Sequence, residues 1–226
     1  MTDLLNIGVL VSGGGSNLQA IIDGCASGFI PARVAVVVSN KKEVHALERA
    51  RKAGIPAFVV DHDQFGGRES FEKTLAELLT RHAVGLVCLA GFMRILSPWF
   101  VHQFSGRVLN IHPALLPAFP GLHVQKRALE SGTRFSGATV HFVDDGVDTG
   151  PIVIQAVVPI LPDDDVNTLS DRILRQEHRI YPLAVRWFAQ KKLRLIDGRV
   201  EMTPGPEQDR EMVLAGEKGW IHPPPA

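Results

Sequence analysis

A chain of 226 residues is long enough to bury one sizeable α/β core and does not require a second large domain. Its 24 basic residues (Lys and Arg) balance 24 acidic residues, which excludes a net field that would draw it to nucleic acid or an anionic membrane. Cys25 and Cys88 lack neighbours at metal-ligand spacing, and no stretch approaches the roughly 20 apolar residues of a membrane helix. We therefore expect a cytoplasmic protein whose partners are small molecules.

Apolar, β-branched runs alternate with segments of helical periodicity through the first half of the chain. The sequence predicts strands at 7–11, 34–40, 57–61, 85–91 and 107–113, with helices at 17–28, 41–54, 68–83 and 97–104 between them. Such alternation is typical of parallel strands joined by right-handed crossovers, with helices on both faces of the sheet. In this architecture ligands bind at the carboxyl ends of the strands.

The pattern changes after residue 136. Apolar runs at 137–145 and 151–160 flank a short glycine-bearing connection, which favours antiparallel pairing. A long helix is expected over about 166–191, with a kink or interruption at Pro182, followed by a hairpin over 193–202. The predicted fold is a single α/β domain over 1–202, with a mostly parallel twisted sheet, an antiparallel C-terminal part and a Rossmann-like N-terminal half, and then a loosely packed tail over 203–226.

A glycine-rich segment, SGGGSN at 12–17, follows the first expected strand and opens the first expected helix. Backbone N–H groups and the positive end of the helix dipole make such a position an anion site. Leu18 stands where a dinucleotide fingerprint has glycine, Asn40 stands near where it has an acidic residue, and the Walker lysine is missing. The loop therefore suits a single phosphate. The alternative is a close-packing turn in which Ser16 or Asn17 caps the helix.

Asn110 and His112 end the fifth expected strand, and residues two apart in a strand face the same side. An amide donor beside an imidazole is suited to hold an oxyanion and to shuttle a proton. The alternative is a structural pair that closes the strand. Asp148, in the acidic connection after the next strand, would favour the imidazolium, unless it belongs to a surface turn.

His141 precedes that acidic connection and lies on one face of its strand, where it is either a supporting residue behind the pair or purely structural. No grouping of histidine, cysteine, aspartate and glutamate has convincing metal-ligand spacing. We therefore predict no catalytic metal.

Six segments in order give the chain a resemblance to the glycinamide ribonucleotide formyltransferases of purine biosynthesis over nearly its whole length. They are SGGGSNLQAII, SNKK, LAGFMRILSP, LNIHPALLPAFPGLH, GATVHFVDDGVDTGPIVIQ and RQEHRIYP. Any one of them alone would be a weak signal, and their order and compatible spacing make the resemblance specific. It implies a phosphate-binding half at about 1–105 and a folate-binding, catalytic half at about 106–202.

The resemblance also implies roles for individual residues. Gly15, Ser16 and Asn17 would bind the ribonucleotide phosphate, and Glu177 would hold its ribose or glycinamide part. The co-substrate 10-formyltetrahydrofolate would contact the following residues: Met93, Arg94, Ile95, Leu96 and Asn110, with Arg68 near its glutamate tail and Asp144, Asp145, Gly146, Val147 and Asp148 at its pteridine edge.

The implied mechanism is direct attack of the substrate amine on the formyl carbon. Asn110 and protonated His112 would stabilise the tetrahedral oxyanion, and Asp148 would orient and charge the imidazole. Binding both substrates at one site supplies a large part of the acceleration. The protein is expected to be a monomer or a weak homodimer.

Four other functions compete with this interpretation. Methionyl-tRNA formyltransferases and formyltetrahydrofolate hydrolases share the asparagine, histidine and aspartate, but we expect them to carry an additional domain, and the former to carry a basic surface as well. A noncatalytic phosphate-binding α/β module would use the glycine loop alone. A nicotinamide-dependent reductase is disfavoured by Leu18 and by the missing acidic residue near Asn40.

Overall fold

The computed structural model describes residues 4–203 and 220–222, and the chain forms two compact units, Met1–Asn110 and Ile111–Ala226. The first unit alternates strands and helices as predicted. Its elements are β1 (Leu5–Val11), α1 (Ser16–Ala26), β2 (Ala32–Ser39), α2 (His45–Lys52), β3 (Ala57–Val59), the 3-10 helix η1 (His62–Gln64), α3 (Arg68–Arg81), β4 (Leu86–Leu89), α4 (Pro98–Gln103) and most of β5 (Val108–His112).

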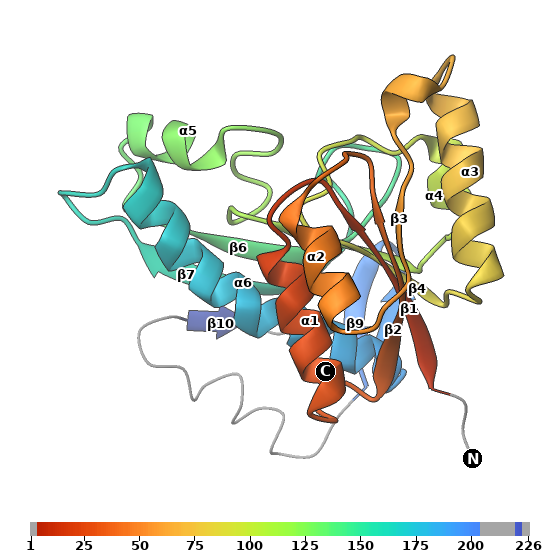
Figure 1. Cartoon of the computed structure of the whole chain (residues 1–226). Helices are drawn as coiled ribbons and strands as arrows, with labels where there is room; N and C mark the ends of the chain where they lie inside the picture. Colours follow the sequence, from red (N-terminus) through yellow and green to blue (C-terminus); the bar gives the residue numbers. More distant parts are fainter. Residues whose placement is uncertain (1–3, 204–219, 223–226) are drawn as a thin grey trace. The chain divides into compact units, whose positions relative to one another are not determined.

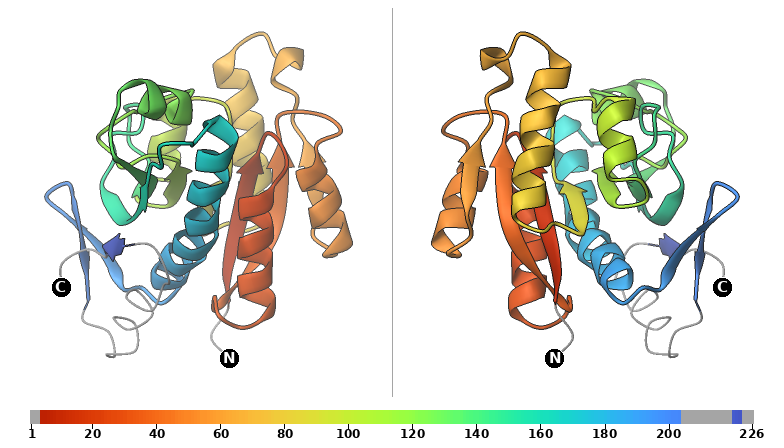
Figure 2. Two further views of the ribbon diagram at one scale, coloured as in Figure 1. Left: turned by 90° about the vertical axis from the view of Figure 1, so that its left-hand side faces the viewer. Right: turned by 90° about the vertical axis from the view of Figure 1, so that its right-hand side faces the viewer.

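The five strands of this unit pair in parallel in the order β3, β2, β1, β4, β5. Helices α1 and α2 lie on one face and α3 and α4 on the other (Figures 1 and 2). Because both faces are covered, the strands are continuously apolar, and the side chains of Val9, Leu10 and Val11 are fully buried. The chain order reverses between β1 and β4, which in open α/β sheets marks the ligand-binding edge.

The second unit is built around antiparallel strands and one long helix. It contains α5 (Val124–Glu130), β6 (Phe135–Phe142), β7 (Ile152–Pro159), α6 (Val166–Ala189), β8 (Leu193–Ile196), β9 (Arg199–Met202) and β10 (Trp220–His222). Strands β6 and β7 pair antiparallel with an irregularity beside His141, and α6 packs against both of them. The predicted α/β class, with a mostly parallel sheet and an antiparallel C-terminal part, is confirmed.

Three details differ from the expectations or add to them. The periodicity analysis missed helix α5, which directly follows the proline-rich loop. Pro182 does not interrupt α6, which runs continuously from Val166 to Ala189. The tail predicted over 203–226 lies mostly outside the described residues, of which 220–222 form β10 and pair antiparallel with β7. The hairpin of β8 and β9 is confirmed, with Asp197 and Gly198 both at positive φ in its turn.

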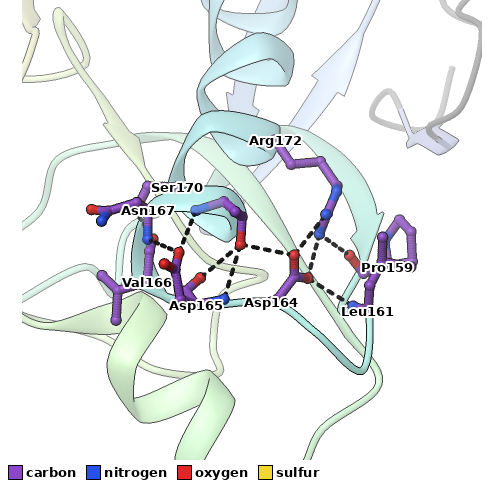
Figure 3. A network of polar contacts seen from close by, with 9 residues as sticks. Pro159, Leu161, Asp164, Asp165, Val166, Asn167, Ser170 and Arg172 are labelled. Carbon is purple, nitrogen blue, oxygen red and sulfur yellow. Dashed lines mark hydrogen bonds and ion pairs between the residues drawn. The ribbon is translucent and has the colours of Figure 1, made fainter.

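A network of hydrogen bonds and an ion pair stabilises the loop between β7 and α6 (Figure 3). Arg172 donates two hydrogen bonds to the Asp164 carboxylate, at 2.5 and 2.7 Å, and a third to the Pro159 carbonyl at 2.9 Å. The Leu161 N–H also donates to Asp164, at 2.7 Å. Asp165 caps the helix through a capping box with Thr168. The start of α6 is thereby held against the end of β7.

No helix in the part of the chain that the structure covers has the length and apolar character needed to cross a bilayer.

The charge of Asp164 should contribute to folding stability. The hydrogen bonds from Arg172, which outweigh the cost of desolvation, hold the pKa of Asp164 below its ordinary value. Asp164→Asn should therefore lower the free energy of unfolding by about 1 kcal/mol at neutral pH, as expected for a well-formed ion pair near the surface. Because protonation removes the same interaction, the difference from wild type should shrink as the pH falls below about 4.

Urea unfolding of both proteins between pH 2.5 and pH 7 measures this difference. Asp171→Asn is the matched control, since Asp171 is exposed on the same helix. An equal, pH-independent effect of the two substitutions would show that the Asp164 charge does not stabilise the fold.

Candidate active site

The glycine loop lies where the sequence predicts, between the end of β1 and the start of α1. Gly15 is the N-cap residue of α1, with φ 72°, and no side chain caps the helix. Neither Ser16 nor Asn17 is therefore the N-cap residue, whereas the close packing that the alternative describes is present at Gly15. The start of a helix is a position where backbone N–H groups and the helix dipole can bind an anion.

Helix α2 supports this loop from one side. The Ala46 N–H donates to the Gly13 carbonyl at 3.1 Å, and Arg49 Nε donates to the Gly14 carbonyl at 2.9 Å. A Cβ atom on Gly15 would lie 2.6 Å from the Ala46 Cβ, whereas one on Gly14 would have nothing within 4 Å. Gly15 is thus required by both its backbone angle and its contact with α2.

His112 and Asp148 come together, although they are far apart in the sequence. His112 Nδ1 lies 3.3 Å from Asp148 Oδ2, and the His112 side chain is 6% exposed. Asp148 Oδ1 lies 3.6 Å from Nε2 of His141, and Asp148 Oδ2 accepts a hydrogen bond of 2.8 Å from the Gly121 N–H. Asp148 itself has φ 55°, a left-handed conformation that aspartate tolerates better than most residues. One half-buried carboxylate therefore contacts two histidines and a backbone N–H.

The second nitrogen of His112 also has an acceptor. His112 Nε2 lies 2.9 Å from the carbonyl oxygen of Phe119, in the proline-rich loop that follows β5. A neutral imidazole donates through one nitrogen only, so acceptors at both nitrogens favour the protonated form. Sequence spacing gave no sign of this contact, because it depends on the left-handed conformation of Phe119.

Burial and charge act in opposite directions on the two titrating groups. Burial is the largest effect on His112 and lowers its pKa, while the Phe119 carbonyl and the charge of Asp148 act to raise it. Burial alone would raise the pKa of Asp148, but the hydrogen bonds from His141 and Gly121 and the charge of His112 lower it overall. The aspartate is therefore ionised at neutral pH, and it supports a proton on His112.

Asn110 lies in β5, two residues before His112, and its side chain is half-buried. The alternation of β strands puts both side chains on one face of that strand, as the sequence indicated. Asn110 closes the first compact unit and His112 falls at the start of the second. Their catalytic roles, and that of Asp148, stay predictions.

The proposed folate residues of the first unit present an apolar surface. Met93 and Ile95 are 61% and 57% exposed, whereas Leu96 is buried. Arg94 is exposed between them, and Arg68 is exposed at the first turn of α3. The structure thus gathers exposed apolar side chains and a cation on the segment after β4.

The acidic connection of the second unit is a structured turn. Asp144 accepts hydrogen bonds from the Gly146 N–H at 3.1 Å and from the Thr149 hydroxyl at 2.8 Å. Asp145 and Val147 are exposed. Glu177, on α6 of the same unit, is 7% exposed. The contacts of these residues with substrates stay predictions.

One group in the described ranges has the geometry to hold a cation. Asp61, His62 and Asp63 place three potential ligand atoms within 4.8 Å of one another. They follow β3, outside the cluster of His112 and Asp148, and Lys42 already pairs with Asp61 at 3.5 Å. Nothing in this geometry links a metal to the candidate active site.

Comparison with known proteins identifies the family. The formyl transferase model matches residues 5–185. The phosphoribosylglycinamide formyltransferase of Escherichia coli is 48% identical over 191 residues, which cover 84% of this chain and 90% of that protein. The crystal structure of glycinamide ribonucleotide transformylase 1 from Symbiobacterium toebii is 51% identical, with a TM-score of 0.88 over 90% of this chain and 96% of that one.

The chain belongs to the formyl transferase family. It is also 55% identical over 181 residues to the trifunctional purine biosynthetic protein adenosine-3 of Drosophila melanogaster, but it spans only 13% of that protein's length. The matched family region contains the glycine loop, the segment after β4 and the cluster of His112 with Asp148.

The glycine loop of this family member should tolerate alanine at one position and not at its neighbour. Gly15→Ala forces a left-handed alanine against Ala46 and should lower the free energy of unfolding by about 2 kcal/mol. Gly14→Ala faces open space and should change it by less than about 0.5 kcal/mol, as surface substitutions do. Thermal and urea unfolding of the two variants, measured in parallel, would contradict this account if their midpoints moved equally.

The titration of His112 should depend on Asp148. Its pKa should lie below the ordinary value near 6.5 because the imidazole is buried, and should fall further in Asp148→Asn because a stabilising negative charge is lost. Since the unfolded chain binds the proton more readily, this histidine reduces stability as the pH falls through the ordinary histidine range, and stability is recovered as the pH rises.

NMR titration of the histidine ring resonances, assigned with His112→Gln, measures both midpoints. Asp145→Asn removes the same charge three residues earlier in the turn and serves as the control. An unchanged His112 midpoint in Asp148→Asn would mean that the carboxylate does not support the proton.

Proposed function

We propose that the chain transfers the formyl group of 10-formyltetrahydrofolate to the amine of N1-(5-phospho-D-ribosyl)glycinamide in de novo purine biosynthesis. The observation that carries the proposal is the buried pairing of His112 with Asp148, at 3.3 Å, in a member of the formyl transferase family. The proposed products are N-formylglycinamide ribonucleotide and tetrahydrofolate. Relatives named for this reaction match over most of the chain.

The ribonucleotide is proposed to bind through its phosphate at the start of α1. The N–H groups of Gly15, Ser16 and Asn17 are proposed to donate to the phosphate, and the loop that carries them is supported by Ala46 and Arg49. Glu177 is proposed to accept hydrogen bonds from the ribose hydroxyls or the glycinamide part. A phosphate site without the Walker lysine fits a monophosphate rather than a nucleoside triphosphate.

The folate is proposed to lie on the apolar segment after β4. The exposed side chains of Met93 and Ile95 offer a surface for a flat ring system, and Arg68 offers a cation for the glutamate tail. Arg94, Leu96 and Asn110 complete the proposed contacts of this unit. In the second unit, the backbone of Asp144–Asp148 is proposed to hydrogen-bond the edge of the pteridine.

The proposed chemistry is a direct acyl transfer. The amine nitrogen forms a bond to the formyl carbon, and the electron pair of the carbonyl moves onto oxygen to give a tetrahedral oxyanion. Collapse of this intermediate breaks the bond to N10 of the folate, which takes up a proton while the former amine loses one. Asn110 and protonated His112 donate hydrogen bonds to the oxyanion, and Asp148 orients the imidazole and favours its protonated form.

In this proposal the formyl oxygen takes the place of the Phe119 carbonyl at His112 Nε2. The imidazole is then already oriented through Nδ1 by Asp148 before substrate arrives, which reduces the reorganisation needed in the transition state. His141 is proposed to support the same carboxylate from its other oxygen, at 3.6 Å. The mechanism needs no metal and no covalent enzyme intermediate.

The proposed partners are the two small substrates, with no nucleic acid or membrane. We further propose that the protein acts in the cytoplasm as a monomer or weak homodimer. These proposals rest on the balanced charge of the chain and on its family.

The test follows the absorbance of 10-formyl-5,8-dideazafolate as glycinamide ribonucleotide is added to the purified protein. Deformylation should require the ribonucleotide, and His112→Ala should reduce kcat by about 10²- to 10⁴-fold, because it removes both a charged donor and a proton carrier. His45→Ala, on the exposed surface of α2, is the matched histidine control and should leave kcat unchanged.

Deformylation without the ribonucleotide would instead identify a hydrolase of formyl folates. Binding of phosphate ligands with no turnover would identify a noncatalytic phosphate-binding module.

A further inference from the structure

One buried hydroxyl connects the glycine loop to the segment after β4. Ser12 follows β1 and directly precedes the three loop glycines, and it is 6% exposed. Its Oγ accepts a hydrogen bond of 2.8 Å from the Met93 N–H, and its own N–H donates to the Gly91 carbonyl at 3.1 Å. The phosphate loop and the proposed folate segment are therefore joined residue to residue inside the first unit.

The direction of the Ser12 hydroxyl is fixed by Asn40. Ser12 donates to Asn40 Oδ1 at 2.5 Å, so its lone pairs are left to accept from Met93. Asn40 is 2% exposed, and its own position is supported by His62, whose Nδ1 lies 3.3 Å from the Asn40 carbonyl oxygen and 3.4 Å from its Nδ2. A buried hydroxyl with one defined donor and one defined acceptor has little freedom to reorient.

The other end of the same segment is held independently. Glu72 of α3, 1% exposed, accepts hydrogen bonds from the Ser97 N–H at 2.7 Å and from the Ser97 hydroxyl. Residues 93–96 therefore span two buried polar anchors, Ser12 on the side of the glycine loop and Glu72 on the side of α4. Because both ends of residues 93–96 are held, a displacement at Ser12 moves the whole short segment.

The two joined loops lie at the carboxyl ends of β1 and β4, where the strand order of the parallel sheet reverses. The proposed phosphate site and the proposed folate site of the first unit therefore both lie at the carboxyl ends of β1 and β4. A ligand that shifts the glycine loop would therefore also shift the hydroxyl that holds the Met93 N–H.

We propose that Ser12 is a positioning residue that couples ribonucleotide binding to folate binding. The inference rests on the proposed function, since it needs both ligands to bind in the first unit. Phosphate binding shifts the glycine loop, and Ser12, held by Asn40, passes that shift through the Met93 N–H to the exposed apolar segment that contacts the folate. Such coupling is reciprocal, so the folate raises the affinity for the ribonucleotide by the same factor.

The experiment measures the Kd of 5,8-dideazafolate by isothermal titration calorimetry, with and without saturating glycinamide ribonucleotide. The ratio of the two Kd values should be at least about 5 for wild type, in the usual range of allosteric coupling, and should fall toward 1 in Ser12→Ala. Ser12→Thr, which keeps the hydroxyl, should retain most of the ratio.

Ser39→Ala is the matched control for loss of a buried serine hydroxyl. Ser39 is fully buried at the end of β2, beside Asn40, and its hydroxyl bonds only the backbone of Lys41 among the hydrogen bonds described here. The coupling ratio should stay at the wild-type value in this variant, even if its unfolding midpoint falls. If Ser12→Ala fails to fold, Ser12→Cys keeps the volume of the side chain and weakens its hydrogen bonds.

A wild-type ratio of 1, or an equal ratio in wild type and in the Ser12→Ala or Ser12→Cys variant, would overturn the coupling. Failure of wild type to bind the ribonucleotide or to turn over would instead overturn the proposed function. The two failures are separate, because turnover can persist while the coupling ratio is 1.

Discussion

Parallel pairing of β1 with both β2 and β4 is the constraint on which the first unit depends. It puts the carboxyl ends of all three strands at one edge and leaves the chain order to reverse between β1 and β4. The glycine loop and the segment after β4 both start there, so their proximity follows from the sheet. Helices on both faces bury the strands and keep that edge fixed.

Buried polar side chains then hold the glycine loop and the segment after β4 in defined positions through hydrogen bonds. Ser12, Asn40 and Glu72 are almost fully buried, and each has a hydrogen-bond partner near the carboxyl ends of the strands. Burying such groups is costly unless they are paired, so a paired set favours one arrangement of the loops over the many that glycine-rich chain would otherwise adopt. The glycines allow the loop backbone to approach neighbouring elements closely, and the hydrogen-bonded polar side chains hold the loops in one arrangement.

In the second unit, hydrogen-bond partners likewise stabilise the charges of His112 and Asp148. Burial disfavours a protonated His112, whereas Asp148 and the Phe119 carbonyl favour it. Asp148 keeps its own charge because His141 and the Gly121 N–H stabilise the carboxylate. The carbonyl and the carboxylate thus oppose the effect of burial on the His112 pKa, which is the kind of environment that the proposed role in holding an oxyanion and exchanging a proton requires.

Local patterns were sufficient to predict the alternating strands and helices and the glycine loop before α1. They also predicted the β8–β9 turn at Asp197-Gly198 and the alignment of Asn110 with His112. Each of these features depends on periodicity or on residues that are close in the chain. Helix α5, the continuity of α6 through Pro182 and the pairing of β10 with β7 depend on tertiary packing that overrides local propensity. The contacts of His112 with Asp148 and Phe119, and of Ser12 with Met93, were decided only by the tertiary structure. They join residues from separate loops through left-handed backbone angles and buried hydrogen bonds, which no spacing along the chain encodes.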